Sequence, residues 1–124
     1  MNILDIKATN DTPRILFDPE NDIFEITGRS LPEDVVTFYQ PVLEWLDEYS
    51  NHPNEKTEFI FKLIYFNTAT SKLIQDILSK LENIYQKGYD VKVYWFYEKD
   101  DEDMRDLGEE FKEYVELPFE IVSY

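Results

Sequence analysis

The chain has 124 residues and a formal net charge of −15 at pH 7, from 27 acidic and 12 basic residues. Its length is that of one domain, and a hydrophobic content of 43%, with nine Phe, nine Tyr and two Trp, is enough for one core. The absence of cysteine excludes disulfides and thiolate catalysis, and the negative charge argues against binding to nucleic acid or anionic membranes.

Two short β-rich segments open the predicted fold. Arg14–Phe17 and Ile23–Thr27 are separated by Asp-Pro-Glu-Asn-Asp, whose residue types favour a turn. The sequence therefore predicts an antiparallel hairpin near the N-terminus.

A first helix is predicted to begin near Leu31. Ser30 and Glu33 have the spacing of a capping box, and Pro32 would fall in the first turn, where proline is tolerated. Pro41 lies further along and lacks a backbone N–H, so we expect a kink or a break there. The apolar residues of this helix recur every three or four positions and would share one face: Val35, Tyr39, Val42, Leu43 and Leu46.

A central strand and a second helix come next. Thr57–Tyr65 is apolar enough to predict a central strand that is buried on both faces. Ser71–Lys87 has the clearest helical pattern, Asn67 or Thr68 can cap its N-terminus, and Gly88 can end it. Its apolar residues follow a period of 3.6: Leu73, Ile74, Ile77, Leu78, Leu81, Ile84 and Tyr85.

The C-terminal third predicts a strand, an acidic helix and a last strand. Asp90–Tyr97 is the first of these strands, and its aromatic run is explained by core packing on both faces rather than by base stacking, which needs a positive groove. The acidic helix runs from about Asp101 to Glu116, and Pro118–Tyr124 is the last strand. The run Asp100–Asp103 lacks the spacing of a calcium loop, so we expect it to stabilise the helix N-terminus.

The element order β-β-α-β-α-β-α-β predicts an α/β fold: a mixed β-sheet with an N-terminal hairpin and helices packed against it. No linker or repeat divides the chain, so we expect one domain over residues 1–124. No apolar run approaches the roughly 18 residues of a membrane span, and no basic region precedes an apolar core at the N-terminus. We therefore expect a cytoplasmic protein that does not contact membranes.

The sequence offers little for catalysis, so we predict no catalytic residue, no metal and no cofactor. His52, the one histidine, lies in a polar loop beside proline, and no hydroxyl or thiol motif accompanies it. Three isolated glycines cannot form a phosphate-binding loop.

The segment Tyr65–Lys72, with sequence YFNTATSK, is the most informative one. It places three hydroxyls and a lysine between the central strand and the second helix. Capping requires one hydroxyl. A phosphate here would meet free N–H groups and the positive end of the helix dipole, so capping and phosphorylation both remain open.

This segment, together with Gly28–Asp34 and Phe38–Leu46, resembles the SiaC family of bacterial regulatory phosphoproteins, and the resemblance covers nearly the whole chain. It implies a fold like the STAS domains of anti-sigma factor antagonists. It also implies a non-enzymatic switch that is phosphorylated on a threonine by a histidine-kinase-like Ser/Thr kinase and dephosphorylated by a PP2C-like phosphatase. When unphosphorylated, the switch would bind and regulate a diguanylate cyclase (GGDEF) protein.

Matching position by position places the phosphoacceptor of the family on Thr68. The resemblance also implies that the whole segment binds the partner: Tyr65, Phe66, Asn67, Thr68, Ala69, Thr70, Ser71 and Lys72.

Two other functions remain open. An enzyme that uses Thr68 as a nucleophile would need a base, and His52 lies in a different predicted loop. Alternatively, the chain could be an acidic protein-binding module, similar to an anti-sigma antagonist or a nucleic-acid mimic, that acts without phosphorylation. Its binding would weaken steeply with salt and survive Thr68→Ala.

Overall fold

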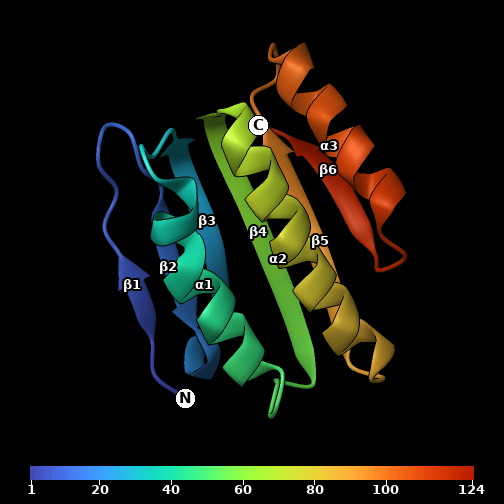
Figure 1. Ribbon diagram of the computed structural model, residues 1–124. Helices are drawn as coiled ribbons and strands as arrows, with labels where there is room; N and C mark the ends of the chain where they lie inside the picture. The colour runs from blue at the N-terminus through green and yellow to red at the C-terminus, as the bar shows by residue number, and fades with distance from the viewer.

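One mixed sheet carries all six strands, which lie side by side in chain order in the computed structural model of residues 1–124 (Figure 1). The β1–β2 and β2–β3 pairs are antiparallel, and the remaining pairs are parallel. The predicted α/β class and mixed sheet are confirmed. The strands are β1 Leu4–Ile6, β2 Arg14–Asp18, β3 Ile23–Ser30, β4 Lys56–Phe66, β5 Asp90–Tyr97 and β6 Phe119–Ser123.

The predicted hairpin is formed by β2 and β3. A 3₁₀ turn at Pro19–Asn21 joins them, and Asp22 closes it with a left-handed φ of 56° and a hydrogen bond from its N–H to the Pro19 carbonyl. The sequence did not predict β1. This strand has only three residues, too few for a clear alternation, and it pairs only with β2.

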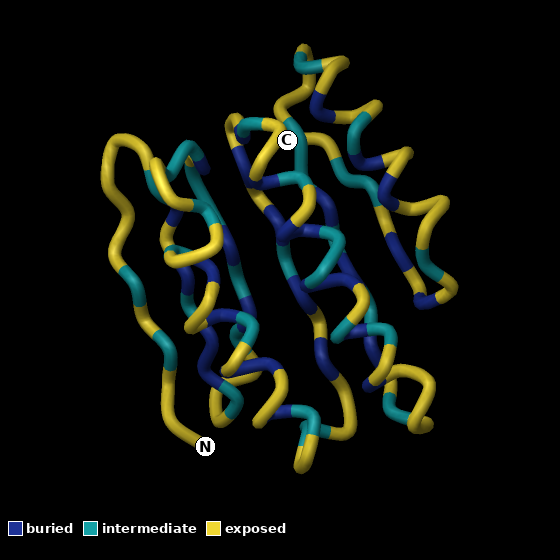
Figure 2. The backbone as a smooth tube through the Cα atoms, viewed as in Figure 1, coloured by how far each residue is buried: buried dark blue, intermediate teal, exposed yellow.

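Three helices connect the parallel strands, and all of them cover the same face of the sheet (Figure 1). They are α1 Val35–Tyr49, α2 Thr68–Gln86 and α3 Glu102–Tyr114. Buried residues lie on the strands and on the helix sides that face them (Figure 2). None of the helices has the length and apolar character that crossing a bilayer requires.

This arrangement corrects one prediction about β4. The strand is interior, as predicted, but it is buried on one face only, because no helix covers the other face. Phe59 and Phe61 lie in the core, whereas Glu58 and Lys62 point to the open face and are exposed. The same holds in β5, where Trp95 is the only buried member of the predicted aromatic run, so packing on both faces was wrong there too.

The start of α1 also differs from the prediction. The helix begins at Val35, and Asp34 caps it by accepting hydrogen bonds from the Thr37 N–H (3.1 Å) and the Thr37 hydroxyl (2.8 Å). These bonds lower the pKa of Asp34. Ser30 does not cap this helix, because it is the last residue of β3 and is buried.

Pro41 does not break α1, which continues without interruption to Tyr49. Pro41 itself is exposed, while Tyr39 and Val42 beside it are fully buried. Core contacts on both sides of the proline therefore stabilise the helix against the loss of one backbone hydrogen bond.

The acidic run Asp100–Asp103 stabilises the N-terminus of α3, as predicted. Asp101 is the N-cap and accepts a hydrogen bond from the Met104 N–H (3.0 Å), and Glu102 and Asp103 lie in the first turn. Negative charge at this end of a helix is favoured by the helix dipole.

Gly108 allows α3 to lie directly against the Trp95 indole. A Cβ added at Gly108 would lie 2.7 Å from Nε1 of Trp95, which is buried and donates a hydrogen bond to the Met104 carbonyl (3.0 Å). We therefore expect Gly108→Ala to lower the free energy of unfolding. Overpacking costs about 1 to 3 kcal/mol, of which the better helix propensity of alanine recovers about 1 kcal/mol.

The matched control for this prediction is Glu109→Ala, which changes an exposed neighbour in the same helix. Urea unfolding should show a lower midpoint for Gly108→Ala and a nearly unchanged one for Glu109→Ala. Equal midpoints for Gly108→Ala and the wild type would contradict the close packing of α3 on Trp95.

Candidate functional site

The segment Tyr65–Lys72 comprises the end of β4, one connecting residue and the first turn of α2. It lies at the edge of the sheet where the parallel strands end and the connecting helices begin (Figure 1). Ligands of open α/β sheets usually bind outside the carboxyl ends of the strands. The segment therefore occupies the edge where a binding site is most expected.

Asn67 caps α2. Its Oδ1 accepts a hydrogen bond from the Thr70 N–H (2.9 Å), which settles the choice between the two predicted caps. Thr68 is the first residue inside the helix. None of the three hydroxyls of the segment is therefore needed as the N-cap.

Thr70 has a structural role. Its side chain is fully buried, and its hydroxyl lies 2.7 Å from Asn67 Oδ1 and 2.9 Å from Ser30 Oγ. The Ser30 hydroxyl is in turn 2.8 Å from the Tyr39 hydroxyl. Burial raises the pKa of Tyr39 to about 12, so this phenol stays neutral in the network.

The Ser30 network joins the end of β3 to α1 and α2, and sequence analysis did not find it. Its hydroxyls come from positions up to 40 residues apart, so no local spacing could reveal them. The only available signal was a serine at the end of an apolar segment.

The other two hydroxyls make no side-chain hydrogen bond within the protein. Thr68 is exposed and Ser71 is half-buried. The N–H groups of Thr68 and Ala69 belong to the first turn of α2 and have no partner inside the helix. Thr68 thus combines an accessible hydroxyl with adjacent free donors at the positive end of a 19-residue helix.

A β-bulge shapes the surface just before Thr68. Gly28 pairs with Leu63 and the next residue, Arg29, pairs with Tyr65, so Ile64 has no partner on β3. Gly28 has a φ of 109°, a region that favours glycine. Ile64 and Tyr65 are consequently both exposed, at 47% and 49%. Bulges are frequent next to functional sites, where they redirect side chains.

Two residues from other elements complete this surface. The Arg29 guanidinium lies 5.9 Å from the centroid of the Tyr65 ring. Leu107 of α3 lines a shallow depression of about 270 Å³ together with Phe66, Asn67, Thr68 and Ser71. Thr68 therefore has apolar surface beside it, part of which comes from a helix that the sequence did not connect with the site.

Lys72 lies one turn after Thr68 in α2. It is exposed, and its Nζ is 3.8 Å from Asp76 Oδ1, so its charge is shared with a carboxylate of the same helix. Exposed pairs of this kind are weak, and a stronger anion could displace Asp76.

The eight predicted site residues thus fall into three groups. Tyr65, Thr68, Ala69 and Lys72 are exposed, Asn67 and Ser71 are half-buried, and Phe66 and Thr70 are buried. The exposed group is the part of the segment that a partner can reach in this conformation.

His52 lies far from this surface. It lies in the loop between α1 and the N-terminal end of β4, whereas Thr68 begins α2 after the C-terminal end of the same strand. A strand of 11 residues spans roughly 35 Å. His52 therefore cannot serve as a general base for the Thr68 hydroxyl.

Comparisons with a protein family and with a known protein both match this chain over all or nearly all of its length. The family described as SiaC family regulatory phosphoprotein matches residues 6–124. An uncharacterized protein of Pseudomonas aeruginosa strain UCBPP-PA14 is 32% identical over 124 residues, which are 100% of this chain and 98% of that protein.

Solved structures of SiaC are also similar to this chain over nearly its whole length. The crystal structure of apo-SiaC from Pseudomonas aeruginosa is similar with a TM-score of 0.88 and 32% identity, over 98% of this chain and 99% of that one. A chain in the crystal structure of the diguanylate cyclase SiaD in complex with its activator SiaC, from the same organism, is similar with a TM-score of 0.90 and 31% identity, over 98% and 99% of the two chains.

Proposed function

Because the chain belongs to the SiaC family of regulatory phosphoproteins, we propose that it is a non-enzymatic switch that binds a diguanylate cyclase and regulates it. Residues 1–124 act as one regulatory domain in the cytoplasm. The SiaC–SiaD complex supports a cyclase as the partner, and the distance between His52 and Thr68 argues against an enzyme. The main support for the proposal is the position of Thr68 at the N-terminus of α2, where its side chain is exposed and its hydroxyl makes no hydrogen bond.

The switch operates by phosphorylation of Thr68. A histidine-kinase-like Ser/Thr kinase transfers the γ-phosphoryl group of ATP to the Thr68 oxygen, ADP leaves, and the hydroxyl proton passes to a base of the kinase. The free N–H groups of Thr68 and Ala69 and the helix dipole stabilise the added charge. A PP2C-like phosphatase hydrolyses the phosphoester and restores the hydroxyl.

The exposed group Tyr65, Thr68, Ala69 and Lys72 forms the contact with the cyclase in the unphosphorylated state. Tyr65 adds a large, half-exposed aromatic side chain, a residue type that is enriched in interfaces. Phe66 and Thr70 support this surface from below, because they are buried. The same surface is offered to the kinase, so cyclase and kinase compete for it.

This function is tested by adding the purified protein to a purified GGDEF cyclase encoded beside it and measuring the formation of cyclic di-GMP from GTP. We expect the rate of cyclic di-GMP formation to change when the protein is added in an amount equimolar with the cyclase. Incubation with the kinase and ATP should then place one phosphate on Thr68, as peptide mass spectrometry would show. An unchanged cyclase rate, or a phosphate on another residue, would refute the proposal.

The acidic surface of α3 distinguishes this function from nucleic-acid mimicry. Glu109, Glu110 and Glu113 are all exposed, and exposed charges usually contribute little to binding. We expect the triple substitution of these residues with Gln to change cyclase affinity by less than about twofold at physiological salt. Calorimetric titration would measure this, and a loss of tenfold or more would favour the acidic-module alternative.

A further inference from the structure

Three fully buried hydroxyls form one chain of hydrogen bonds that ends beside Thr68. Tyr39 of α1, Ser30 at the end of β3 and Thr70 of α2 are each 0% exposed. The Tyr39 and Ser30 hydroxyls are 2.8 Å apart, and Ser30 Oγ is 2.9 Å from Thr70 Oγ1. The last member is Asn67, whose Oδ1 lies 2.7 Å from Thr70 Oγ1. The chain therefore connects α1 and β3 to the residue immediately before Thr68.

The acceptor at the end of this chain fixes the direction of its hydrogen bonds. An amide oxygen can only accept, and Asn67 Oδ1 is closer to the Thr70 hydroxyl (2.7 Å) than the Ser30 carbonyl is (3.2 Å), so Thr70 donates to Asn67. Because each hydroxyl has one proton, Ser30 then donates to Thr70, and Tyr39 donates to Ser30. Every hydrogen bond of the chain is thus directed toward Asn67.

Thr68 is held on both sides by this chain. Asn67 precedes it, Thr70 follows two positions later, and the Asn67 N–H also donates to the Ser30 carbonyl (3.1 Å). The ends of helices ordinarily fray. Here the N-cap and the third residue of α2 are both bonded to β3, so the first turn stays folded. The Thr68 backbone is fixed, while its own side chain is exposed and makes no hydrogen bond.

Helix α1 has the same local capping arrangement without the buried chain. Asp34 accepts hydrogen bonds from the N–H and the hydroxyl of Thr37, as Asn67 does from Thr70. Thr37 and Thr70 are both the third residue of their helix, but Asp34 and Thr37 are exposed. The connection to the interior is therefore what distinguishes α2, and Thr37 provides a matched control for Thr70.

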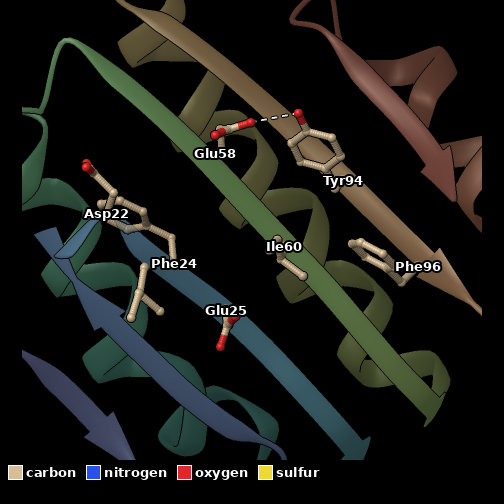
Figure 3. Close-up of a pocket in the computed structure, with 8 residues that line it drawn as sticks. Asp22, Phe24, Glu25, Glu58, Ile60, Tyr94 and Phe96 are labelled. Carbon is tan, nitrogen blue, oxygen red and sulfur yellow. Dashed lines mark hydrogen bonds between the residues drawn. The ribbon is translucent and has the colours of Figure 1, made fainter.

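Burial makes the hydrogen bonds of the chain difficult to replace. On the open face of the sheet, the Tyr94 hydroxyl donates to Glu58 (2.7 Å) at a position where water can replace either partner (Figure 3). Water does not reach Ser30 or Thr70, so the loss of one hydroxyl leaves a buried polar group unpaired. Removing a member of the chain therefore loosens the turn that carries Thr68.

We propose that Ser30 and Thr70 are positioning residues for the phosphorylation of Thr68, an inference that rests on the proposed function. Their hydroxyls keep the first turn of α2 in the conformation that the kinase binds. A protein whose binding-competent conformation is only partly populated binds more weakly in proportion to that fraction. The two hydroxyls therefore affect the KM of the kinase for this protein and leave its kcat unchanged.

The test compares the full chain with three variants as substrates of the purified kinase of the proposed switch, with ATP in excess. Thr70→Val keeps the shape of the side chain and removes the hydroxyl, whereas Thr70→Ser keeps the hydroxyl. We expect Thr70→Val to raise KM at least about tenfold with kcat within about twofold, and Thr70→Ser to stay within about threefold of the wild type. Thr37→Val should leave both constants within about twofold.

Amide hydrogen exchange measures the same loosening in the protein alone. The Ser71 N–H donates to the Asn67 carbonyl in the first turn of α2, and in Thr70→Val it should exchange at least about tenfold faster. The N–H of Ile77, in the middle of α2, should change by a much smaller factor. An equal increase at Ser71 and Ile77 with a wild-type KM would show global destabilisation and overturn the proposal.

Ser30→Ala keeps the test decisive if Thr70→Val folds poorly. It removes the hydroxyl between Tyr39 and Thr70 but leaves the bond from Thr70 to Asn67, so KM should rise by at least about threefold. A wild-type KM in both variants, or a lower kcat with a wild-type KM, would overturn the positioning role and leave the switch intact. A wild-type protein that the kinase does not phosphorylate on Thr68 would overturn the proposed function and this inference with it.

Discussion

A phosphate on Thr68 is expected to reduce the affinity for the diguanylate cyclase by about a hundredfold or more. Phosphorylation adds about −1.5 to −2 charges at pH 7 to a chain that already carries −15. A cyclase that packs against Tyr65 and Thr68 must desolvate this group or face it with a cation. An unpaired buried charge costs several kcal/mol, and about 1.4 kcal/mol corresponds to a tenfold change in affinity.

Two substitutions at Thr68 distinguish the effect of losing the hydroxyl from the effect of adding a negative charge. Thr68→Ala should keep cyclase affinity within about threefold and should not accept a phosphoryl group, because its side chain makes no hydrogen bond in the protein. Thr68→Asp should weaken binding, by less than the phosphate does, because one carboxylate has less charge and fewer acceptor oxygens.

Ser79→Asp is the matched control, since it adds the same charge to an exposed position 11 residues further along α2, roughly 16 Å away. Equal loss of affinity in Thr68→Asp and Ser79→Asp would indicate long-range repulsion instead of a contact at Thr68.

Phe61→Asp is expected to abolish folding. Phe61 is 1% exposed, and its ring centroid lies 5.1 Å from that of Phe59 and 5.4 Å from that of Trp95. The substitution removes a large buried ring, which costs about 3 to 5 kcal/mol, and adds the cost of a buried charge. Because domains of this size are stable by roughly 5 to 15 kcal/mol, little or no stability should remain.

Lys62→Asp tests the same strand one residue later, on the open face. It introduces the same carboxylate where water reaches it, so the variant should stay soluble and melt cooperatively, within a few degrees of the wild type. Circular dichroism during heating measures both variants. A cooperative transition at the wild-type temperature in Phe61→Asp would contradict its place in the core.

Much of the fold follows from local sequence signals. The apolar period of α2, the Asn67 cap and the acidic start of α3 each depend on residues within one or two turns, and the structure bears all of them out. Ser30 shows where local signals fail. Its spacing to Glu33 fits a capping box, but β3 extends as far as Ser30 and buries it, so tertiary structure overrides the helix signal.

The one-sided sheet could not be predicted from composition. Ile60, Ile64 and Phe96 are as apolar as the core residues between them, and only the placement of all three helices on one side leaves them accessible. The likeness to STAS domains stays a prediction.

In the candidate site, too, some features could be predicted from neighbouring residues, whereas others depend on contacts between residues far apart in the sequence. The family resemblance predicted Thr68 as the phosphoacceptor, and this stays a prediction. The residues of the segment Tyr65–Lys72 did not by themselves show that Thr70 has a structural role, because its partner Ser30 lies 40 positions earlier. Arg29 and Leu107 reach the site from other elements and had no local signal.

The central claim is that phosphate on Thr68 controls binding to the cyclase, and isothermal titration calorimetry tests it most directly. The protein is phosphorylated to completion by the kinase, confirmed by mass spectrometry, and titrated against the isolated cyclase beside the unphosphorylated protein. The account predicts tight binding of the unphosphorylated protein and a dissociation constant at least about a hundredfold higher for the phosphorylated one. Equal dissociation constants would contradict the switch and leave Thr68 as an ordinary first-turn residue of α2.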